Sequence, residues 1–203
     1  KQDYPKALSL YKEALALNPD ILKIRHDMVK TLIFMGNYDE ALSNADLLIS
    51  KNDKNWVYYQ LKGFILLWQN KYNDALINFQ KALKLLGSEN LIPPKALLLN
   101  TGVTLSLKGH YKIADEILGD MIKEDMLSTE VKPDNMPIYL ALIENSLRSG
   151  DKIKAQAYAS RMVIHFGKEV VLQNISLFMD NRASAPISKK IVEPFIQDFI
   201  ENM

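Results

Sequence analysis

The sequence contains no cysteine among its 203 residues. This absence excludes disulfide bonds, metal sites built on thiolates and cysteine nucleophiles. It leaves the compartment open, because cytoplasmic proteins and proteins of the bacterial periplasm can both lack cysteine. With eight glycines and eight prolines, the chain also lacks the composition of a flexible linker protein. Its 48% apolar and 24% charged residues instead indicate a globular protein.

Charge and hydropathy exclude two further classes of partner. The 25 basic and 24 acidic residues are interspersed, so the sequence has no basic field that would attract nucleic-acid phosphates. No stretch approaches the roughly 18 uninterrupted apolar residues of a transmembrane helix, and the charged start does not resemble a signal peptide. We therefore expect neither nucleic-acid binding nor membrane insertion of this segment.

No arrangement typical of catalysis or cofactor binding is present. The histidines, His26, His110 and His165, are far apart, and no His-x-x-x-His pair or histidine–carboxylate cluster occurs. Neighbouring carboxylates such as Asp115 and Glu116 would point away from each other on a helix. Glycine-rich phosphate loops, nucleophile elbows and dinucleotide fingerprints are missing. We expect no enzymatic activity, no cofactor and no metal in this segment.

What the sequence does contain is an internal repeat. Five alanines follow polar breaks and are separated by 34, 34, 39 and 41 residues: Ala7, Ala41, Ala75, Ala114 and Ala155. A second set repeats with the same separations: Ala14, Leu48, Ala82, Met121 and Met162. A period of about 34 residues with insertions predicts a stack of helix pairs.

The clearest unit begins at Trp56, and the break Gln69-Asn70-Lys71 divides it into two halves. Two helices joined by so short a turn can touch only where side chains are small. We therefore expect Gly63 in the first half to face Ala75 in the second. The residues of the second half that share one helical face are Tyr72, Ala75, Phe79 and Ala82.

These residues resemble the tetratricopeptide repeat family, whose units are 34-residue antiparallel helix pairs with a glycine in the first helix and alanines around an aromatic in the second. The resemblance covers residues 1–168 and implies an all-α, right-handed superhelical solenoid. It divides them into a half repeat at 1–21 and repeats at 22–55, 56–89, 95–128 and 136–169, with divergent capping helices at 170–203. The sequence departs from the family pattern most at Val29, Ala45, Ile143, Lys152 and Ala159.

Proline-containing insertions at 87–94 and 128–137 predict surface loops, with Gly87 ending one helix and a new helix starting at or just after Pro94. Pro194 should break or kink the last helix. The sequence starts at the turn of a unit whose first helix is missing. We therefore expect the protein to continue upstream with further repeats, and the exposed half repeat is a candidate contact between two copies of the chain.

In the family, residues 2, 5, 9, 12 and 13 of each first helix line an inner groove. The resemblance implies that the partner-binding residues are Lys23, His26, Lys30, Phe34, Gln60, Phe64, Leu67, Trp68, Leu99, Val103 and Leu107, and that the last repeat adds Pro137, Leu140, Glu144, Leu147 and Arg148. The middle of this surface is apolar and aromatic, and its basic first edge favours an acidic flank on a bound segment. Alternatively, Phe34, Leu67 and Trp68 only pack between neighbouring first helices.

We predict a protein-interaction module that binds a peptide segment of another protein. Some co-chaperones of the family resemble one another in a two-carboxylate clamp, but the residues here at clamp positions, such as His26, Leu61 and Asn100, cannot grip two carboxylates. Two alternatives stay open. The chain is a scaffold whose groove is closed by its own cap or by a second copy, or it is the non-catalytic arm of a larger protein, such as a transferase.

Overall fold

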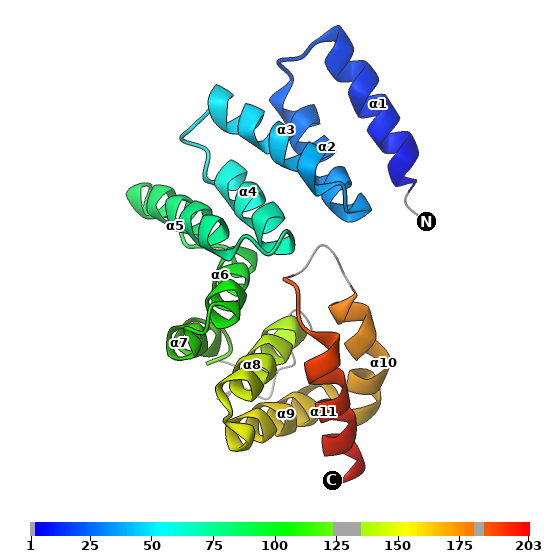
Figure 1. Cartoon of the computed structure of the whole chain (residues 1–203), viewed down its shortest axis with the longest axis vertical. Coiled ribbons are helices and arrows are strands. Elements are labelled where there is room, and N and C mark those ends of the chain that lie inside the picture. The colour runs from blue at the N-terminus through cyan, green and yellow to red at the C-terminus, as the bar shows by residue number, and fades with distance from the viewer. Residues whose placement is uncertain (1–2, 124–134, 181–184) are drawn as a thin grey trace. The chain divides into compact units, whose positions relative to one another are not determined.

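The computed structural model describes residues 3–123, 135–180 and 185–203, and all regular secondary structure in these ranges is helical (Figure 1). The chain forms two compact units, Lys1–Pro93 and Pro94–Met203, called unit 1 and unit 2 below. The predicted all-α fold built of helix pairs is confirmed. The described helices are α1 (Tyr4–Leu17), α2 (Leu22–Met35), α3 (Tyr38–Lys51), α4 (Trp56–Trp68), α5 (Tyr72–Ser88), α6 (Lys95–Leu107), α7 (Tyr111–Met121), α8 (Met136–Ser149), α9 (Lys152–Phe166), α10 (Lys168–Met179) and α11 (Lys189–Glu201).

The turn inside each helix pair has the same geometry. In each turn one residue has a positive φ, between 60° and 84°, and these residues are Gly36, Asn70, Gly109 and Gly150. The next backbone N–H donates to a carbonyl oxygen five residues earlier, and the distance is 2.9 Å in all four turns. This is the hydrogen bond of a left-handed helix C-cap, which glycine and asparagine adopt most easily. The polar breaks of the sequence are therefore compact helix-to-helix turns.

Unit 1 contains α1 and the pairs α2–α3 and α4–α5. Ala41 and Ala75 have no exposed area. A Cβ atom added to Gly63 would lie 2.6 Å from Cε1 of Phe79 and 3.1 Å from the carbonyl oxygen of Ala75. The predicted contact of Gly63 with Ala75 is therefore confirmed, and Phe79 closes the other side of the glycine.

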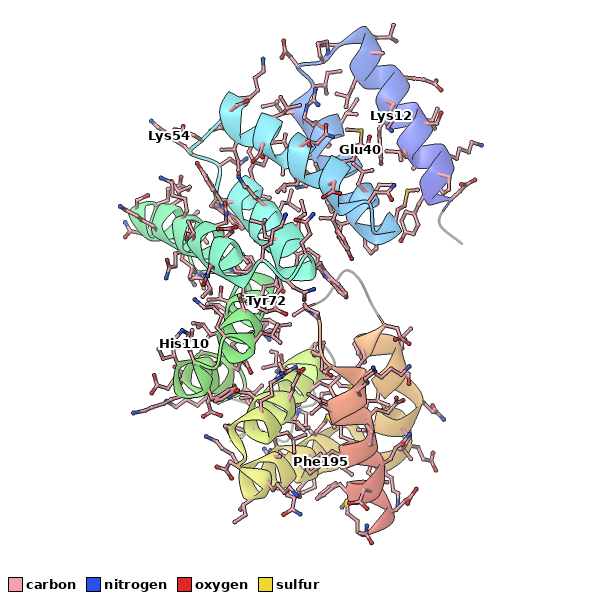
Figure 2. All side chains as sticks on the ribbon, in the orientation of Figure 1. Lys12, Glu40, Lys54, Tyr72, His110 and Phe195 are labelled. Carbon is pink, nitrogen blue, oxygen red and sulfur yellow. The ribbon has the colours of Figure 1, made fainter. Side chains whose placement is uncertain are left out.

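The first helix, α1, corresponds to α3 and α5, the second helices of the two pairs in unit 1, but it is less enclosed than they are. Its N-terminus is capped by Asp3, whose Oδ1 accepts the N–H of Lys6 at 3.1 Å. It packs against α2, and Nζ of Lys12 reaches Oε1 of Glu40 on α3 at 2.8 Å (Figure 2). Both side chains of this ion pair are exposed, so it adds little stability. Ala7 is only half-buried, because no described helix covers it as α2 covers Ala41.

Unit 2 contains the pairs α6–α7 and α8–α9, followed by α10 and α11. Ala114 and Ala155 have no exposed area, and a Cβ atom on Gly102 would lie 2.7 Å from the side chain of Leu118. The last helix, α11, contacts α8, α9 and α10, so it packs directly on the last pair (Figure 1). One buried cluster joins residues of α6 and α8 to Ala185, Ile187 and the buried face of α11.

One local prediction was wrong. Helix α5 continues through Gly87 to Ser88, and Asn90, with φ of 55°, takes the left-handed position beyond it. Of the two effects predicted for Pro194, a break does not occur: helix α11 continues through it, and Val192, Ile196 and Ile200 form its buried stripe. The new helix predicted near Pro94 begins at Lys95. Most of the insertion at 128–137 lies outside the described residues.

Candidate functional site

The basic edge of the predicted groove is open to solvent on α2. Lys23 and Lys30 are exposed, and His26 is half-buried between them. The His26 ring lies 6.5 Å from the ring of Tyr58 on α4, and its Nδ1 is 3.3 Å from Oδ1 of Asp27. Two exposed cations beside a partly covered imidazole form a basic surface of the kind that attracts carboxylates.

Two predicted aromatic residues stack on tyrosines at the start of the preceding helix. The Phe34 ring lies 5.2 Å from that of Tyr4, and the planes differ by 12°. The Trp68 ring lies 6.2 Å from that of Tyr38, and the planes differ by 13°. Each tyrosine precedes its partner by 30 residues, so this contact repeats with the helix pairs. Phe34 and Trp68 therefore pack inside unit 1, and their half-buried rings also contribute to its surface.

The other predicted residues of α4 differ in exposure. Gln60 is half-buried, and Phe64 is 8% exposed with its ring edge-on to Trp68 at 6.5 Å. Leu67 has no exposed area. Leu67, in the last turn of α4, is therefore a core residue of this structure. A bound segment would not contact its side chain directly.

In unit 2, the predicted inner-face residues are less exposed to solvent than Lys23 and Lys30 of unit 1. Leu99 is 8% exposed, Val103 is 4% exposed and Leu107 is half-buried. On α8, Leu140 has no exposed area. These residues belong to one buried cluster with Ala185 and Ile187, which precede α11 in an extended segment. The segment before α11 therefore shares a core with these residues, and its Ser188 contacts Glu144, another residue that the resemblance assigns to the groove.

A buried glutamate fixes this segment. Glu144 on α8 is 4% exposed, and its Oε1 accepts the Nε–H of Arg148 at 2.7 Å. Its Oε2 accepts the backbone N–H of Ser188, the residue before α11, at 2.8 Å. A negative charge at the start of a helix is stabilised by the helix dipole. At the other end of α11, Nζ of Lys168 donates to the carbonyl oxygen of Ile200 at 2.9 Å.

A polar cluster between α7 and α9 was not predicted. Nζ of Lys154 lies 2.5 Å from Oδ2 of Asp115, and the Tyr158 hydroxyl donates to Oδ1 of Asp115 at 3.2 Å. Burial, and then the charge of Asp115, raise the pKa of the Tyr158 hydroxyl above its ordinary range. Asp115 and Lys154 also line a cavity of about 300 Å³. Asp115 lies in one repeat, and Lys154 and Tyr158 lie in the next, beyond an insertion. The spacing of these residues in the sequence therefore did not indicate that they would meet.

The described residues contain no group of three or more histidine, cysteine or acidic side chains that could hold a metal ion. His110 precedes α7 and is exposed (Figure 2), whereas His165 on α9 is 8% exposed and lies edge-on to Phe166 at 5.3 Å. No helix in the described ranges has the length and apolar character required to span a bilayer.

The sequence profile of the tetratricopeptide repeat family matches residues 1–65. The human protein O-mannosyl-transferase TMTC1 is 24% identical over 158 residues, which are 78% of this chain. The chain spans only 17% of the length of that relative.

Solved structures share the fold. PilW, a type IV pilus biogenesis factor, matches with a TM-score of 0.71 and 16% identity over 99% of this chain and 86% of PilW. YrrB, described as a tetratricopeptide repeat protein with an unusual peptide-binding site, matches with a TM-score of 0.59 and 15% identity over 95% of this chain and 91% of YrrB.

Proposed function

We propose, on the premise that this chain is built of tetratricopeptide repeats, that it binds a peptide segment of a partner protein on the inner face of unit 1. The fold is generally a module for protein–protein interaction, and typically it is not catalytic. The proposed contacts are Lys23, His26, Lys30, Phe34, Gln60, Phe64 and Trp68. On unit 2, the predicted contacts Leu99 and Val103 are no more exposed than Phe64, and Leu107 is half-buried. We place the primary site on unit 1 because the exposed Lys23 and Lys30 lie there.

The exposure of α2 carries this proposal. Lys23 and Lys30 are the exposed residues at the second and ninth positions of the helix, and Phe34 lies half-buried at the thirteenth. A basic edge beside aromatic rings favours a segment with acidic residues at one end and apolar anchors next to them.

A peptide-display selection on the immobilised chain, followed by fluorescence anisotropy with the selected peptide, tests the site. We expect Lys30→Glu to weaken binding of an acidic peptide about fivefold, and Trp68→Ala to weaken it about thirtyfold. Lys54→Glu is the matched control, because Lys54 is an exposed lysine in the loop before α4 (Figure 2). Circular dichroism checks that each variant folds. Unchanged affinity in Lys30→Glu, Phe64→Ala and Trp68→Ala would refute this placement.

A scaffold role is the second candidate, and one observation favours it. In unit 2 the extended segment before α11 occupies inner-face positions and is fixed by Glu144. A groove that the protein's own segment closes has no room for a peptide, and this favours a structural role for unit 2 over peptide binding. The similarity to a short part of an O-mannosyl-transferase is consistent with such an arm of a larger protein. Selection of no peptide, with a concentration-dependent dimer in sedimentation, would favour the scaffold.

A further inference from the structure

Aromatic residues recur in unit 1 where first helices end and second helices begin. Tyr4, Tyr38 and Tyr72 are the first residues of α1, α3 and α5, and each follows the previous one by 34 residues. Phe34 and Trp68 lie in the last turns of α2 and α4 and are also 34 residues apart. All five side chains are half-buried, so each also contributes to the surface. We call these five residues the aromatic row.

The rings of the aromatic row are ordered by contacts within unit 1. Tyr4 stacks on Phe34 and Tyr38 stacks on Trp68, with planes that differ by 12° and 13°. The Tyr72 hydroxyl donates to Oδ1 of Asn70 at 2.8 Å (Figure 2). The row therefore consists of three steps, two stacked pairs and then Tyr72. Because these rings are held before a ligand arrives, little side-chain freedom is lost when one binds.

The middle step shows that neighbouring repeats leave the row accessible. Tyr38 belongs to α3 and Trp68 to α4, and these helices contact α2 before them and α5 after them. Both rings are still half-buried and not enclosed. The accessibility of this step is therefore compatible with a continuous stack of repeats.

The spacing of the steps selects one peptide conformation. Helices α2 and α4 contact each other, and packed helices lie about 8–10 Å apart. A polyproline II segment presents the same face every three residues, or about 9.3 Å, which matches this interval. An α-helix presents the same face about every 5.4 Å, and two of its turns, about 10.8 Å, exceed the interval. An extended strand does so about every 6.6 Å, so neither a helix nor a strand places one equivalent group on each step.

We propose that the segment bound by unit 1 is proline-rich and adopts the polyproline II conformation, with a proline at every third residue against successive steps of the aromatic row. This inference rests on the proposed peptide site and names the class of segment that occupies it. Proline is apolar, and a proline-rich segment is largely in this conformation before it binds. The contact with aromatic rings therefore costs little conformational entropy.

The charge beside the row indicates where the acidic residues of the segment lie. Lys30 is exposed and precedes Phe34 by one turn of α2. The equivalent residue of α4 is Phe64, which is 8% exposed and packs edge-on against Trp68. The basic charge is thus beside the Phe34 step and not beside the Trp68 step. We expect acidic residues at the end of the proline-rich segment that meets Phe34.

Two fluorescein-labelled peptides of identical composition test this inference by anisotropy with the full chain. Both contain prolines and alanines and carry acidic residues at both ends. In the first peptide every third residue is proline, whereas in the second the separations between prolines alternate between two and four residues. We expect the first peptide to bind about tenfold more tightly, because only its prolines meet successive steps.

Two variants of the row and one control complete the experiment. Trp68→Leu and Tyr72→Leu keep an apolar side chain but remove a ring of the row, and each should reduce the preference for the first peptide. Trp56→Leu should retain it, because Trp56 is also a half-buried tryptophan of α4 but begins the helix, at the end opposite the row. Circular dichroism checks that each variant folds, and Tyr72→Leu decides alone if Trp68→Leu does not fold.

A preference for the three-residue spacing that the row variants lose and Trp56→Leu keeps would establish the inference. It would be overturned by equal affinity for the two peptides, by no binding of either, or by a preference that the row variants keep or that Trp56→Leu also loses. An acidic peptide without regular prolines that binds the chain and loses affinity in Trp68→Ala would overturn it too. That last result would leave the proposed peptide site intact.

Discussion

The contact between the two helices of a pair is decided by single residues. Gly63 has room for no side chain, since Phe79 and the backbone of Ala75 lie on either side. The regular spacing of Ala75 and Phe79 was enough to predict that Gly63 faces the second helix. The sequence did not show that Phe79, more than Ala75, limits the space, because side-chain conformation depends on the packed neighbours.

The pair Gly63 and Phe79 should behave as a unit in stability. We expect Gly63→Val to lower the free energy of unfolding by about 1–3 kcal/mol through overpacking, and Phe79→Ala to lower it by about 3–5 kcal/mol through a cavity. The double variant should lose clearly less than the sum, since valine fills space left by phenylalanine. Urea unfolding followed by tryptophan fluorescence measures this in unit 1, because both tryptophans lie on α4. If the double variant lost the sum of the two single losses in unfolding free energy, Gly63 and Phe79 would not share this space.

Tyr158 should make unit 2 sensitive to alkaline pH. Its folded pKa is raised above the ordinary value of 10.0, first by burial and then by Asp115. The unfolded chain therefore releases this proton more readily, and the stabilising contribution, complete below pH 10, is lost as pH rises further. Tyr158→Phe should reduce the fall in urea midpoint above pH 10, as measured by circular dichroism. Tyr72→Phe is the control, because the Tyr72 hydroxyl lies 2.8 Å from the amide oxygen of Asn70 instead of a carboxylate.

At the scale of the element, α11 is held at both ends by groups that match its dipole. Glu144 accepts from the residue before its first turn, and Lys168 donates to a carbonyl of its last turn. The helix also carries Pro194 without interruption. The sequence predicted a break or a kink there, because the cost of proline is local and visible in the sequence. The stabilisation that prevents a break comes from distant residues that only the fold brings together.

Removing the charge of Glu144 should loosen α11. We expect Glu144→Gln to leave Arg148 without its ion pair and to weaken the bond to Ser188, at a cost of about 2 kcal/mol. Amide hydrogen exchange should then become about thirtyfold faster along α11, while α7 is unaffected. Glu116→Gln removes an exposed carboxylate from α7 and serves as the control. Equal protection of α11 in both variants would show that apolar packing alone fixes the helix.

At the scale of the whole molecule, the period of the alanines was enough to predict the fold class, and the first helices begin at the starting residues of the four predicted repeats. It was not enough to predict which inner-face positions are open. Lys30 and Leu67 were both predicted as contacts, with packing alone left open as the alternative for Leu67. Lys30 is exposed and Leu67 is buried. Exposure depends on how neighbouring helices and the C-terminal segment pack, and no periodic pattern encodes that.

The two units also treat their inner faces differently. In unit 1 the cationic residues of α2 are exposed, whereas in unit 2 Ala185 and Ile187 are buried and Ser188 binds Glu144 of α8. A family resemblance assigns the same role to equivalent positions in every repeat. Only the structure shows that the equivalent positions differ in exposure from repeat to repeat.

The turns at Gly36, Asn70, Gly109 and Gly150 are poor places for inserting foreign sequence. Each contains only two or three residues between helices, so one added residue would rotate the second helix and move its alanine off the neighbour. The connectors between pairs already vary in length, from the residues after Lys51 to the longer stretch after Ser88. A tag, a crosslinker or a fluorescent reporter therefore belongs in a connector, because an insertion there leaves the packing within both neighbouring helix pairs unchanged.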